Sequence, residues 1–298
     1  MTNVLSNPAF DDATRREHLY GGDVMVYGAS PATLALVEFT RELVEEAFGD
    51  RDPELAQYEM AVEDFAALLA DLKPRFIHHP RCKELLPQIL SERGCDLDRT
   101  YFDVPRLRTS TSDDFLTTGI AFAFHPHRDT WYSAPLCQTN WWMPVYPVTS
   151  ENVMAFHPQY MHRGIRNGSR RYDYAEWNKS SRQDAAKHIG KDTRDQPTPE
   201  EPVELDPQVR VVPEVGGMMV FSGNQLHSSV PNTSGRTRFS IDFRVVDIDD
   251  VAKDHGSVNV DSECSGTSLR DFKRASDLAP MPEDLAARYD GVNIPAGV

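Results

Sequence analysis

A histidine and an aspartate two residues apart could bind a metal ion together with a histidine much later in the chain. The apolar run GIAFAF ends at Phe124 and is followed by HPHRD, which contains His127 and Asp129. Residues two apart in an extended chain point to the same face, so this imidazole and carboxylate could bind one metal. His227 could supply a second imidazole. The sequence therefore suggests a metal site with two histidines and one carboxylate.

An HxD tripeptide is a weak signal alone, because His127 and Asp129 could instead form a hydrogen-bonded pair on a sheet surface. His125 shares the face of His127 and could compete as a ligand. The HxD spacing favours His127, which leaves His125 as a residue of the surrounding pocket. With His227 added, the set matches the facial triad of non-haem Fe(II) enzymes, which leaves metal positions open.

An arginine follows the distal histidine at a spacing that suggests a second binding group. Arg238 lies eleven residues after His227, and Ser240 would share its face of a strand. A guanidinium can bind a carboxylate through two hydrogen bonds, and a hydroxyl can add a third. Arg236 is expected to be exposed and is the alternative to Arg238, while Arg244 is expected to form a structural ion pair.

Three segments together resemble the Fe(II)/2-oxoglutarate-dependent dioxygenase superfamily, and its phytanoyl-CoA-dioxygenase-like branch in particular. They are HPHRD, NWWMPVYPVTSENVMAFHPQYMHRG and GGMMVFSGNQLHSSVPNTSGRTRFSIDFR. Residues 149–152 match the family's T-x-E-N-G turn, but Val153 replaces its glycine. Only Pro158 and His162 are kept from its PGSH stretch. The resemblance covers about residues 119–165 and 209–247, under half of the chain.

The resemblance implies a double-stranded β-helix, the jelly-roll or cupin-like fold, with Fe(II) bound by His127, Asp129 and His227. The cosubstrates would be O2 and 2-oxoglutarate, whose far carboxylate would bind Arg238 with help from Ser240. The implied reaction hydroxylates an unactivated C–H bond and releases succinate and CO2. Related halogenases carry a small residue at the carboxylate position, so Asp129 favours hydroxylation, or desaturation and cyclisation, over halogenation.

Several aromatic and amide side chains near these motifs are candidates for the pocket. Trp131 and Tyr132 follow the metal motif where this superfamily often lines the substrate site, although both could be ordinary core residues. Gln138, Asn140 and Trp142 alternate along an expected strand and could face 2-oxoglutarate. Which face points inward stays open, because a slip of one residue exchanges the two faces of a strand.

A polar segment, residues 163–207, interrupts the β-rich region and is expected to be an insertion or a lid. Residues 163–195 contain nine Lys or Arg and five Asp or Glu, a local charge of +4. One interpretation is a solvated loop. The other is that Arg170, Arg171 or Arg166 binds a carboxylate or phosphate of the substrate while Trp177 or Tyr172 closes over it.

The expected elements place these residues in a β core with an N-terminal helical layer, an α+β fold with mainly β structure. A helix is expected from Pro31 to about Phe48, a second from Asp52 to Lys73, and a third around Leu85–Leu90, beside a short strand at residues 24–27. Short runs separated by polar turns suggest a sandwich or barrel rather than βαβ units. The expected strands are Thr100–Leu107, Gly119–Phe124, Gln138–Tyr146, Val153–Phe156, Val209–Val212, Met218–Phe221 and Thr237–Val246.

Composition limits the class of protein without naming an activity. The 298 residues are 40% hydrophobic and 26% charged, with a net charge of −15, which disfavours nucleic-acid and anionic-membrane partners. The four cysteines form no CxxC pair, and no leader or membrane span is visible, so a reducing cytoplasm is expected. We expect one domain over residues 1–298, with a helical layer at 1–98, the jelly-roll core at 99–250 and an irregular tail at 251–298.

Function is narrowed to three classes by these features. The leading one is a 2-oxoglutarate-dependent hydroxylase for a small molecule, such as an amino acid or a secondary-metabolite intermediate, which could be anionic. The second is a jelly-roll metal protein without oxygenase activity, either a cupin-type isomerase or a binding module. The third is a zinc hydrolase, in which the open metal position would activate water. The sequence does not indicate an oligomeric state.

Overall fold

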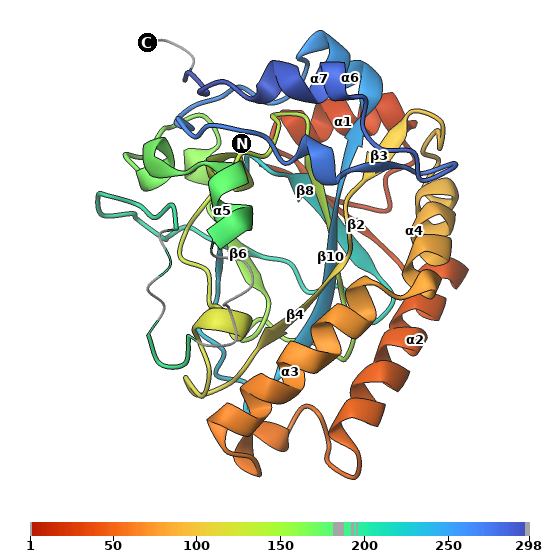
Figure 1. Cartoon of the computed structure of the whole chain (residues 1–298), viewed down its shortest axis with the longest axis vertical. Coiled ribbons are helices and arrows are strands. Elements are labelled where there is room, and N and C mark those ends of the chain that lie inside the picture. The colour runs from red at the N-terminus through yellow and green to blue at the C-terminus, as the bar shows by residue number, and fades with distance from the viewer. Residues whose placement is uncertain (1, 181–187, 192–193, 195, 296–298) are drawn as a thin grey trace.

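Two β-sheets pack against each other, and helices cover the outer face of the larger one in the computed structural model (Figure 1). The structure describes residues 2–180, 188–191, 194 and 196–295. The fold is a mixture of helices and strands in which nearly all strand pairs are antiparallel, the pair β1–β2 being parallel. The mainly β core with an N-terminal helical layer agrees with the sequence-based expectation.

The larger sheet has eight strands and the smaller one has three. The order in the larger sheet is β1-β2-β8-β5-β10-β3-β11, with β4 also paired to β10, and the order in the smaller sheet is β7-β6-β9. The strands are β1 Val4–Ser6, β2 Val24–Tyr27, β3 Thr100–Phe102, β4 Arg106–Ser110, β5 Thr139–Pro144, β6 Met154–Phe156, β7 Val209–Arg210, β8 Met218–Ser222, β9 His227–Ser229, β10 Arg238–Asp247 and β11 Lys273–Arg274.

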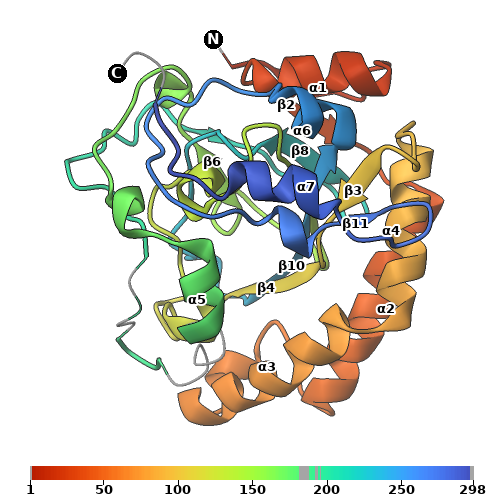
Figure 2. The same cartoon turned by 45° about the horizontal axis from the view of Figure 1, so that its top comes forward.

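The N-terminal helices pack on the outer face of the large sheet, as Figures 1 and 2 show for α2, α3 and α4. The helices are α1 Asp12–Tyr20, α2 Pro31–Phe48, α3 Val62–Ile77, α4 Pro80–Glu92, α5 Tyr174–Ser180, α6 Ile248–Lys253 and α7 Glu283–Ala286. Ser30 and Thr33 form a capping box at the start of α2, and Pro31 occupies its first turn. Because these groups satisfy free backbone N–H groups, they fix where the helix begins.

Apolar and charged side chains alternate along β10. The apolar ones face the core under the helices, and the charged ones face the space between the two sheets. Phe239, Ile241 and Phe243 point outward into the cluster shared with α2, α3 and α4. Arg238 and Arg244 point the other way, toward the space between the two sheets. Successive residues of a strand face opposite sides, so one strand supplies both the core and a charged inner wall.

Several predicted elements differ from the observed ones. Gly119–Phe124 is not a strand: a 3-10 turn occupies Gly119–Ala121. Thr100–Leu107 divides into β3 and β4. The predicted helix start at Asp52 is wrong, because a 3-10 turn over Ala56–Tyr58 precedes α3. The predicted end of this helix at Lys73 is also wrong, because Pro74 lies within the last turn of α3, which continues to Ile77.

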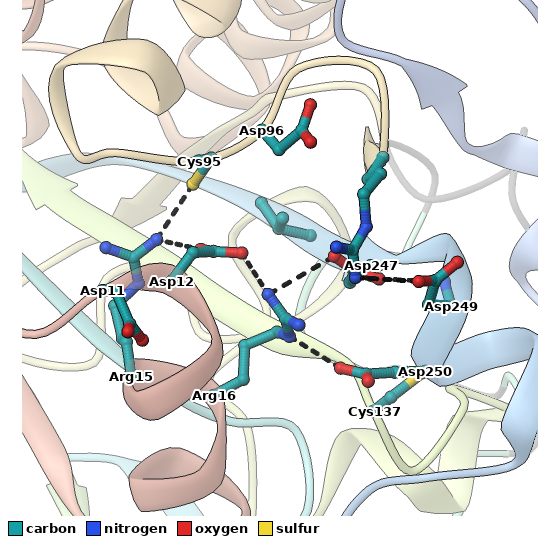
Figure 3. A network of polar contacts seen from close by, with 12 residues as sticks. Asp11, Asp12, Arg15, Arg16, Cys95, Asp96, Cys137, Asp247, Asp249 and Asp250 are labelled. Atoms are coloured by element: carbon teal, nitrogen blue, oxygen red, sulfur yellow. Dashed lines mark hydrogen bonds and ion pairs between the residues drawn. The ribbon is translucent and has the colours of Figure 1, made fainter.

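The missed helix α1 is fastened to the end of β10 and to α6 by a network of ion pairs (Figure 3). Arg16 pairs with Asp12 in its own helix and reaches Asp250 at 2.6 Å and Asp247 at 3.4 Å. Arg15 is buried and also pairs with Asp12. This helix is mostly polar, so its apolar periodicity is weak, and partners far along the chain hold it in place.

Residues 254–295 pack along one end of the large sheet, and their regular elements are β11, α7 and two short 3-10 turns. Leu269, Phe272 and Met281 form a separate small core with Val246 and Val251. Cys82, Cys95, Cys137 and Cys264 are all buried and free, which agrees with the absence of a disulfide framework. Within the described ranges, no helix has the length and apolar character needed to cross a membrane.

Candidate metal centre and adjoining cavity

His127, Asp129 and His227 come together beside the small sheet. His127 lies in an extended segment that pairs with β9, and the backbone N–H of each histidine donates to the carbonyl of the other at 2.9 Å. Asp129 Oδ1 lies 3.7 Å from Nε2 of His127 and 3.9 Å from Nε2 of His227. The possible ligand atoms of the three side chains all lie within 4.8 Å of one another. The residues predicted from the sequence thus converge on one point.

Both imidazole rings present the same nitrogen to this point. His127 Nδ1 lies 2.8 Å from the carbonyl oxygen of His125, and His227 Nδ1 lies 2.9 Å from that of Gln225. A carbonyl oxygen only accepts hydrogen bonds, so each Nδ1 carries a proton, and in the neutral form of the ring the lone pair lies on Nε2. Metal-bound histidines are oriented in this way. The donor set therefore fits one divalent first-row metal such as Fe(II).

The surroundings hold the groups in the forms that bind metals. Burial, followed by the nearby His227, lowers the pKa of His127 to about 3, so the ring is neutral near pH 7. Burial acts to raise the pKa of Asp129, but the charges of His227 and Arg244 oppose it and bring the pKa below its ordinary value. Metal ligands must be deprotonated, and His127 and Asp129 meet that condition near pH 7.

Two amides fix the carboxylate of Asp129. Gln138 Nε2 donates to Asp129 Oδ2 at 3.0 Å, and Asn140 Nδ2 donates to the same oxygen at 2.8 Å. The other oxygen is left facing the histidines. Asn140 also lines the cavity, but Gln138 does not. The Gln138 amide, predicted to face 2-oxoglutarate, is turned toward the carboxylate and toward Asn140 Oδ1.

A cavity of about 410 Å³ adjoins the triad between the two sheets. One wall is the inner face of β4, β5 and β10, and the opposite wall includes β6, β9, and α5 from the insertion (Figure 1). His127, Asp129 and His227 all line it. A small organic molecule inside this cavity could therefore contact a bound metal directly.

Arg238 lines the cavity and is nearly covered by its neighbours. Its guanidinium carbon lies 5.6 Å from the ring centroid of Trp142, and Nη1 donates to the Asn152 carbonyl at 2.8 Å. Nε is buried and has no hydrogen-bond partner among the described residues. Burial lowers the pKa of Arg238 to about 10, so the group is still a cation near pH 7. A buried cation with an unused donor is suited to a bound anion.

The other residues predicted near Arg238 have different positions. Ser240 shares its strand face but does not reach the cavity wall, because its short side chain is covered and its Oγ has no hydrogen-bond partner among the described residues. Arg236 is half exposed and pairs with Glu54 at 3.1 Å, as expected of the alternative arginine. Arg244 forms the expected structural pair, 2.9 Å from Asp103, and it also lines the cavity.

Of the aromatic candidates, Tyr132 and Trp142 line the cavity and Trp131 does not. Trp131 is fully buried on the other side of its turn, where Nε1 donates to Asp261 at 2.7 Å. The ordinary core interpretation is therefore correct for Trp131. His125 is exposed and outside the cavity, because the chain turns its ring outward against the edge of Phe122.

The two arginines predicted to bind substrate from the insertion lie outside the cavity. Arg170 pairs with Glu263 at 2.6 Å and Arg171 with Glu200 at 2.7 Å, and both are exposed. Their carboxylate partners on the protein surface hold them away from the metal centre. The insertion does reach the cavity, through the aromatic residues Tyr172 and Trp177 and through Tyr174, Asn178, Arg194 and Gln196. Part of the expected lid, including residues 181–187, lies outside the described residues.

A group of charged cavity residues was missed by the sequence reasoning. Lys73, Arg106, Arg108 and Asp242 all face the interior. The alternation of charged and apolar residues along Arg106–Ser110 was the available signal, since charges two apart share one face of a strand. It could not be interpreted before the pairing of β4 with β10 was known.

No family model and no curated protein matches this chain. Several solved structures are similar to it at low identity. EvdO2 from Micromonospora carbonacea var. aurantiaca, complexed with 2-oxoglutarate, is 14% identical over 80% of this chain and 92% of its own, with a TM-score of 0.44. AviO1 from Streptomyces viridochromogenes Tue57 is 15% identical over 81% and 97%, with a TM-score of 0.39.

A third similar structure is described as the non-haem α-ketoglutarate-dependent epimerase SnoN from nogalamycin biosynthesis. It is 13% identical over 79% of this chain and 84% of its own, with a TM-score of 0.38. Such neighbours include non-haem iron and 2-oxoglutarate enzymes, the class that the sequence resembles. Because every one of these TM-scores is below 0.5, the functional argument rests on the residues of the cavity.

Proposed function

We propose that this protein is an Fe(II)- and 2-oxoglutarate-dependent oxygenase that hydroxylates a C–H bond of a small molecule. The observation that carries the proposal is the shared cavity of His127, Asp129, His227 and Arg238. Three ligands with both Nε2 atoms facing Asp129 leave metal positions open for other molecules. A buried arginine in the same cavity provides a binding group for the far carboxylate of a diacid.

The bound iron would supply the oxidising chemistry, in which O2 converts 2-oxoglutarate to succinate and CO2 and the substrate C–H to C–OH. His127, Asp129 and His227 would hold the metal, and Asn140 and Gln138 would keep the carboxylate turned toward it. Arg238 would fix the orientation of the cosubstrate by binding its far carboxylate. The surrounding aromatic wall would exclude bulk water from the reacting groups.

The proposal extends to the fold and the insertion. The two sheets would be the two halves of a jelly roll, with the segment containing His127 added beside β9, in a single domain over residues 1–298. Residues 163–207 would act as a lid, since Tyr172 and Trp177 come from this segment and line the cavity. Amino acids and secondary-metabolite intermediates are the proposed range of substrates.

The test is to mix anaerobic protein with Fe(II) and 2-oxoglutarate and to record the visible spectrum. We expect a weak charge-transfer band that is absent in Asp129→Ala, and succinate formation once O2 is admitted. A protein that binds Fe(II) but gives neither the band nor succinate would be a non-oxygenase metal protein. Zinc-dependent hydrolysis without O2 would instead indicate the hydrolase alternative.

The role of Arg238 has its own matched control. Replacing Arg238 by Met should weaken 2-oxoglutarate binding by about tenfold or more, since a buried charged partner is removed. Arg236→Met, two residues away and exposed, should leave the affinity unchanged. Both variants should bind the metal as the wild type does. Loss of affinity in Arg236→Met alone would transfer the role to Arg236.

A further inference from the structure

A second cationic site faces the same cavity at the opposite end of β10. Arg106 Nη1 lies 2.6 Å and Arg244 Nε lies 2.9 Å from the same oxygen of Asp103. The backbone N–H of Arg244 donates to the other oxygen at 2.8 Å. Arg106 and Arg244 both line the cavity, whereas Asp103 does not. One carboxylate between two guanidinium groups leaves one positive charge in excess.

The nearby charges do not remove this excess. Arg108 is neutralised by Asp242, with Nε 2.6 Å from Oδ1. Among the described residues, the basic side chains of Lys73, Arg106, Arg108, Arg194, Arg238 and Arg244 line the cavity together with the carboxylates of Asp129 and Asp242, and Asp103 pairs with Arg106 and Arg244. Asp129 is committed to the metal centre. A buried positive charge is costly unless an anion pairs with it, so the wall is suited to a second anion besides a diacid at Arg238.

Strand geometry separates the two cationic sites. Arg238 and Arg244 lie on one face of β10, six residues apart, which corresponds to about 20 Å along the strand. Arg244 is paired across the sheet with Asn140, whose side chain holds Asp129. The Arg106–Arg244 site therefore adjoins the metal centre. An anion bound there would be distinct from one bound at Arg238.

A series of neighbouring aromatic rings, beginning at His127 of the metal centre, lines the cavity. The ring centroids of His127 and Tyr132 are 5.6 Å apart, those of Tyr132 and Tyr172 are 5.3 Å apart, and those of Tyr172 and Trp177 are 5.8 Å apart. All four side chains line the cavity. Aromatic rings bind planar apolar groups by offset or edge-to-face packing. This wall is suited to a ring-containing molecule.

We infer that the substrate is a small ring-containing molecule with one oxyanion, a carboxylate or a phosphate, held by Arg106 and Arg244 while its ring packs on Tyr132, Tyr172 and Trp177. The inference rests on the proposed function for calling this molecule a substrate. Arg106 and Arg244 thus take the anion-binding role that was predicted from the sequence for Arg170 and Arg171. The binding site itself depends only on the residues of the cavity.

Binding of simple probes tests the inference without a known substrate. Benzoate and phenyl phosphate carry a ring and an oxyanion, benzamide carries the ring without the charge, and acetate carries the charge without the ring. We expect calorimetry on the wild-type protein to show that either aromatic anion binds about tenfold or more tightly than benzamide or acetate. Comparison of benzoate with phenyl phosphate identifies the preferred oxyanion. Equal affinities for benzoate and benzamide would overturn the inference.

Variants then locate the site. Arg106→Gln and Arg244→Gln should each weaken the binding of the preferred aromatic anion by about tenfold or more, whereas Arg236→Gln should not. Arg238→Gln should retain this binding. The assignment would be contradicted if Arg238→Gln alone lost binding, or if neither Arg106→Gln nor Arg244→Gln weakened it. Thermal unfolding of each variant checks that it is folded, and the wild-type comparison of probes stands if a variant is not.

The anaerobic spectrum distinguishes this inference from the proposed function. With Fe(II) and 2-oxoglutarate present, the charge-transfer band should persist in Arg106→Gln and Arg244→Gln and be lost at low 2-oxoglutarate in Arg238→Gln. If the wild type shows no band but still binds the aromatic anion through Arg106 and Arg244, the proposed function fails and the anion site stands. If the wild type shows the normal band but binds benzoate no more tightly than benzamide, the proposed function stands and the anion site fails.

Discussion

The backbones of His127 and His227 are hydrogen-bonded to each other in both directions, and the centroids of their imidazole rings lie 4.3 Å apart. The main chain thus brings together two segments that are far apart in the sequence. The two rings are further fixed by hydrogen bonds from Nδ1 to the carbonyls of His125 and Gln225. These contacts therefore fix the position of the two rings relative to each other.

Replacing His227 by Ala should abolish tight metal binding while leaving the fold intact. The backbone pairing does not need the imidazole, but the metal loses one of three protein ligands. We expect the affinity for Co(II), measured by anaerobic calorimetry, to fall by about a hundredfold or more. The control is His255→Ala, since His255 is half exposed and pairs with Glu17. Unchanged Co(II) affinity in His227→Ala would exclude this residue from the site.

The amide of Asn140 should affect metal binding although it does not touch the metal. Its hydrogen bond to Asp129 Oδ2 orients the carboxylate, and loss of such a partner typically weakens metal affinity by about 10- to 100-fold. Asn140→Ala should therefore bind Co(II) more weakly, and Gln138→Ala should show a smaller loss because Asn140 remains. A double variant that is no weaker than Gln138→Ala would show that Asn140 has no orienting role.

The three candidate metal ligands were predictable because they depend on local spacing and on residue type. His127 and Asp129 are two residues apart, and Arg238 lies eleven residues after His227. Both spacings can be read from the sequence without knowing the order of the strands. The alternation along β5 and β10 was also visible, although only the structure shows that Asn140 and Trp142 face inward while Trp141 faces the helices.

The remaining site residues depend on contacts between distant segments. Arg106 becomes part of the cavity because β4 pairs with β10, which places it opposite Asp242. Trp131 was expected near the substrate, yet Asp261 binds its indole N–H on the far side of the turn. The segment Gly119–Phe124 has the composition of a strand, but its first residues find no strand partner and form a 3-10 turn. Local sequence patterns do not contain this information.

Removing the carboxylate of Asp103 should destabilise the protein markedly. Asp103 is buried between Arg106 and Arg244, so Asp103→Ala would leave two cations without their common partner. Breaking a buried ion pair in this way costs about 3–5 kcal/mol of the free energy of unfolding. The control is Asp71→Ala, whose largely exposed pair with Arg75 should contribute at most about 1 kcal/mol. Urea unfolding of both variants measures the difference. Equal losses of the free energy of unfolding would show that the buried ion pairs of Asp103 contribute no more to stability than the exposed pair of Asp71.

Lys73 should make stability depend on pH. Burial, followed by the charge of Arg108, lowers the pKa of Lys73 from 10.5 to about 7. Between these values the unfolded chain holds the proton and the folded protein does not, so stability rises with pH through this window. Lys73→Met removes the cost of burying this amine. Lys73 borders the cavity, so solvent there reduces the cost of burying its charge. We therefore expect Lys73→Met to raise the free energy of unfolding by roughly 2 kcal/mol near pH 6.

This gain from Lys73→Met should shrink as the pH rises and disappear above 10.5. Urea unfolding at several pH values measures it. Lys83→Met, on the exposed side of α4, is the control for the loss of a lysine and should change stability by at most about 0.5 kcal/mol. A gain that is independent of pH would show that the effect comes from packing and not from the buried amine.

Gly256 marks the place where the C-terminal segment crosses the chain beside β5 too closely for any side chain. A Cβ atom added there would lie 2.5 Å from the carbonyl carbon of Leu136 and 2.6 Å from the backbone nitrogen of Cys137. The neighbouring Ser257 N–H donates to the Leu136 carbonyl at 3.0 Å, so the two chains cannot separate without losing this bond. Gly256→Ala should therefore lower the free energy of unfolding by about 1–3 kcal/mol. Gly291→Ala, where an added Cβ meets no atom within 4 Å, should be close to neutral, and a neutral Gly256→Ala would mean that the C-terminal segment shifts freely.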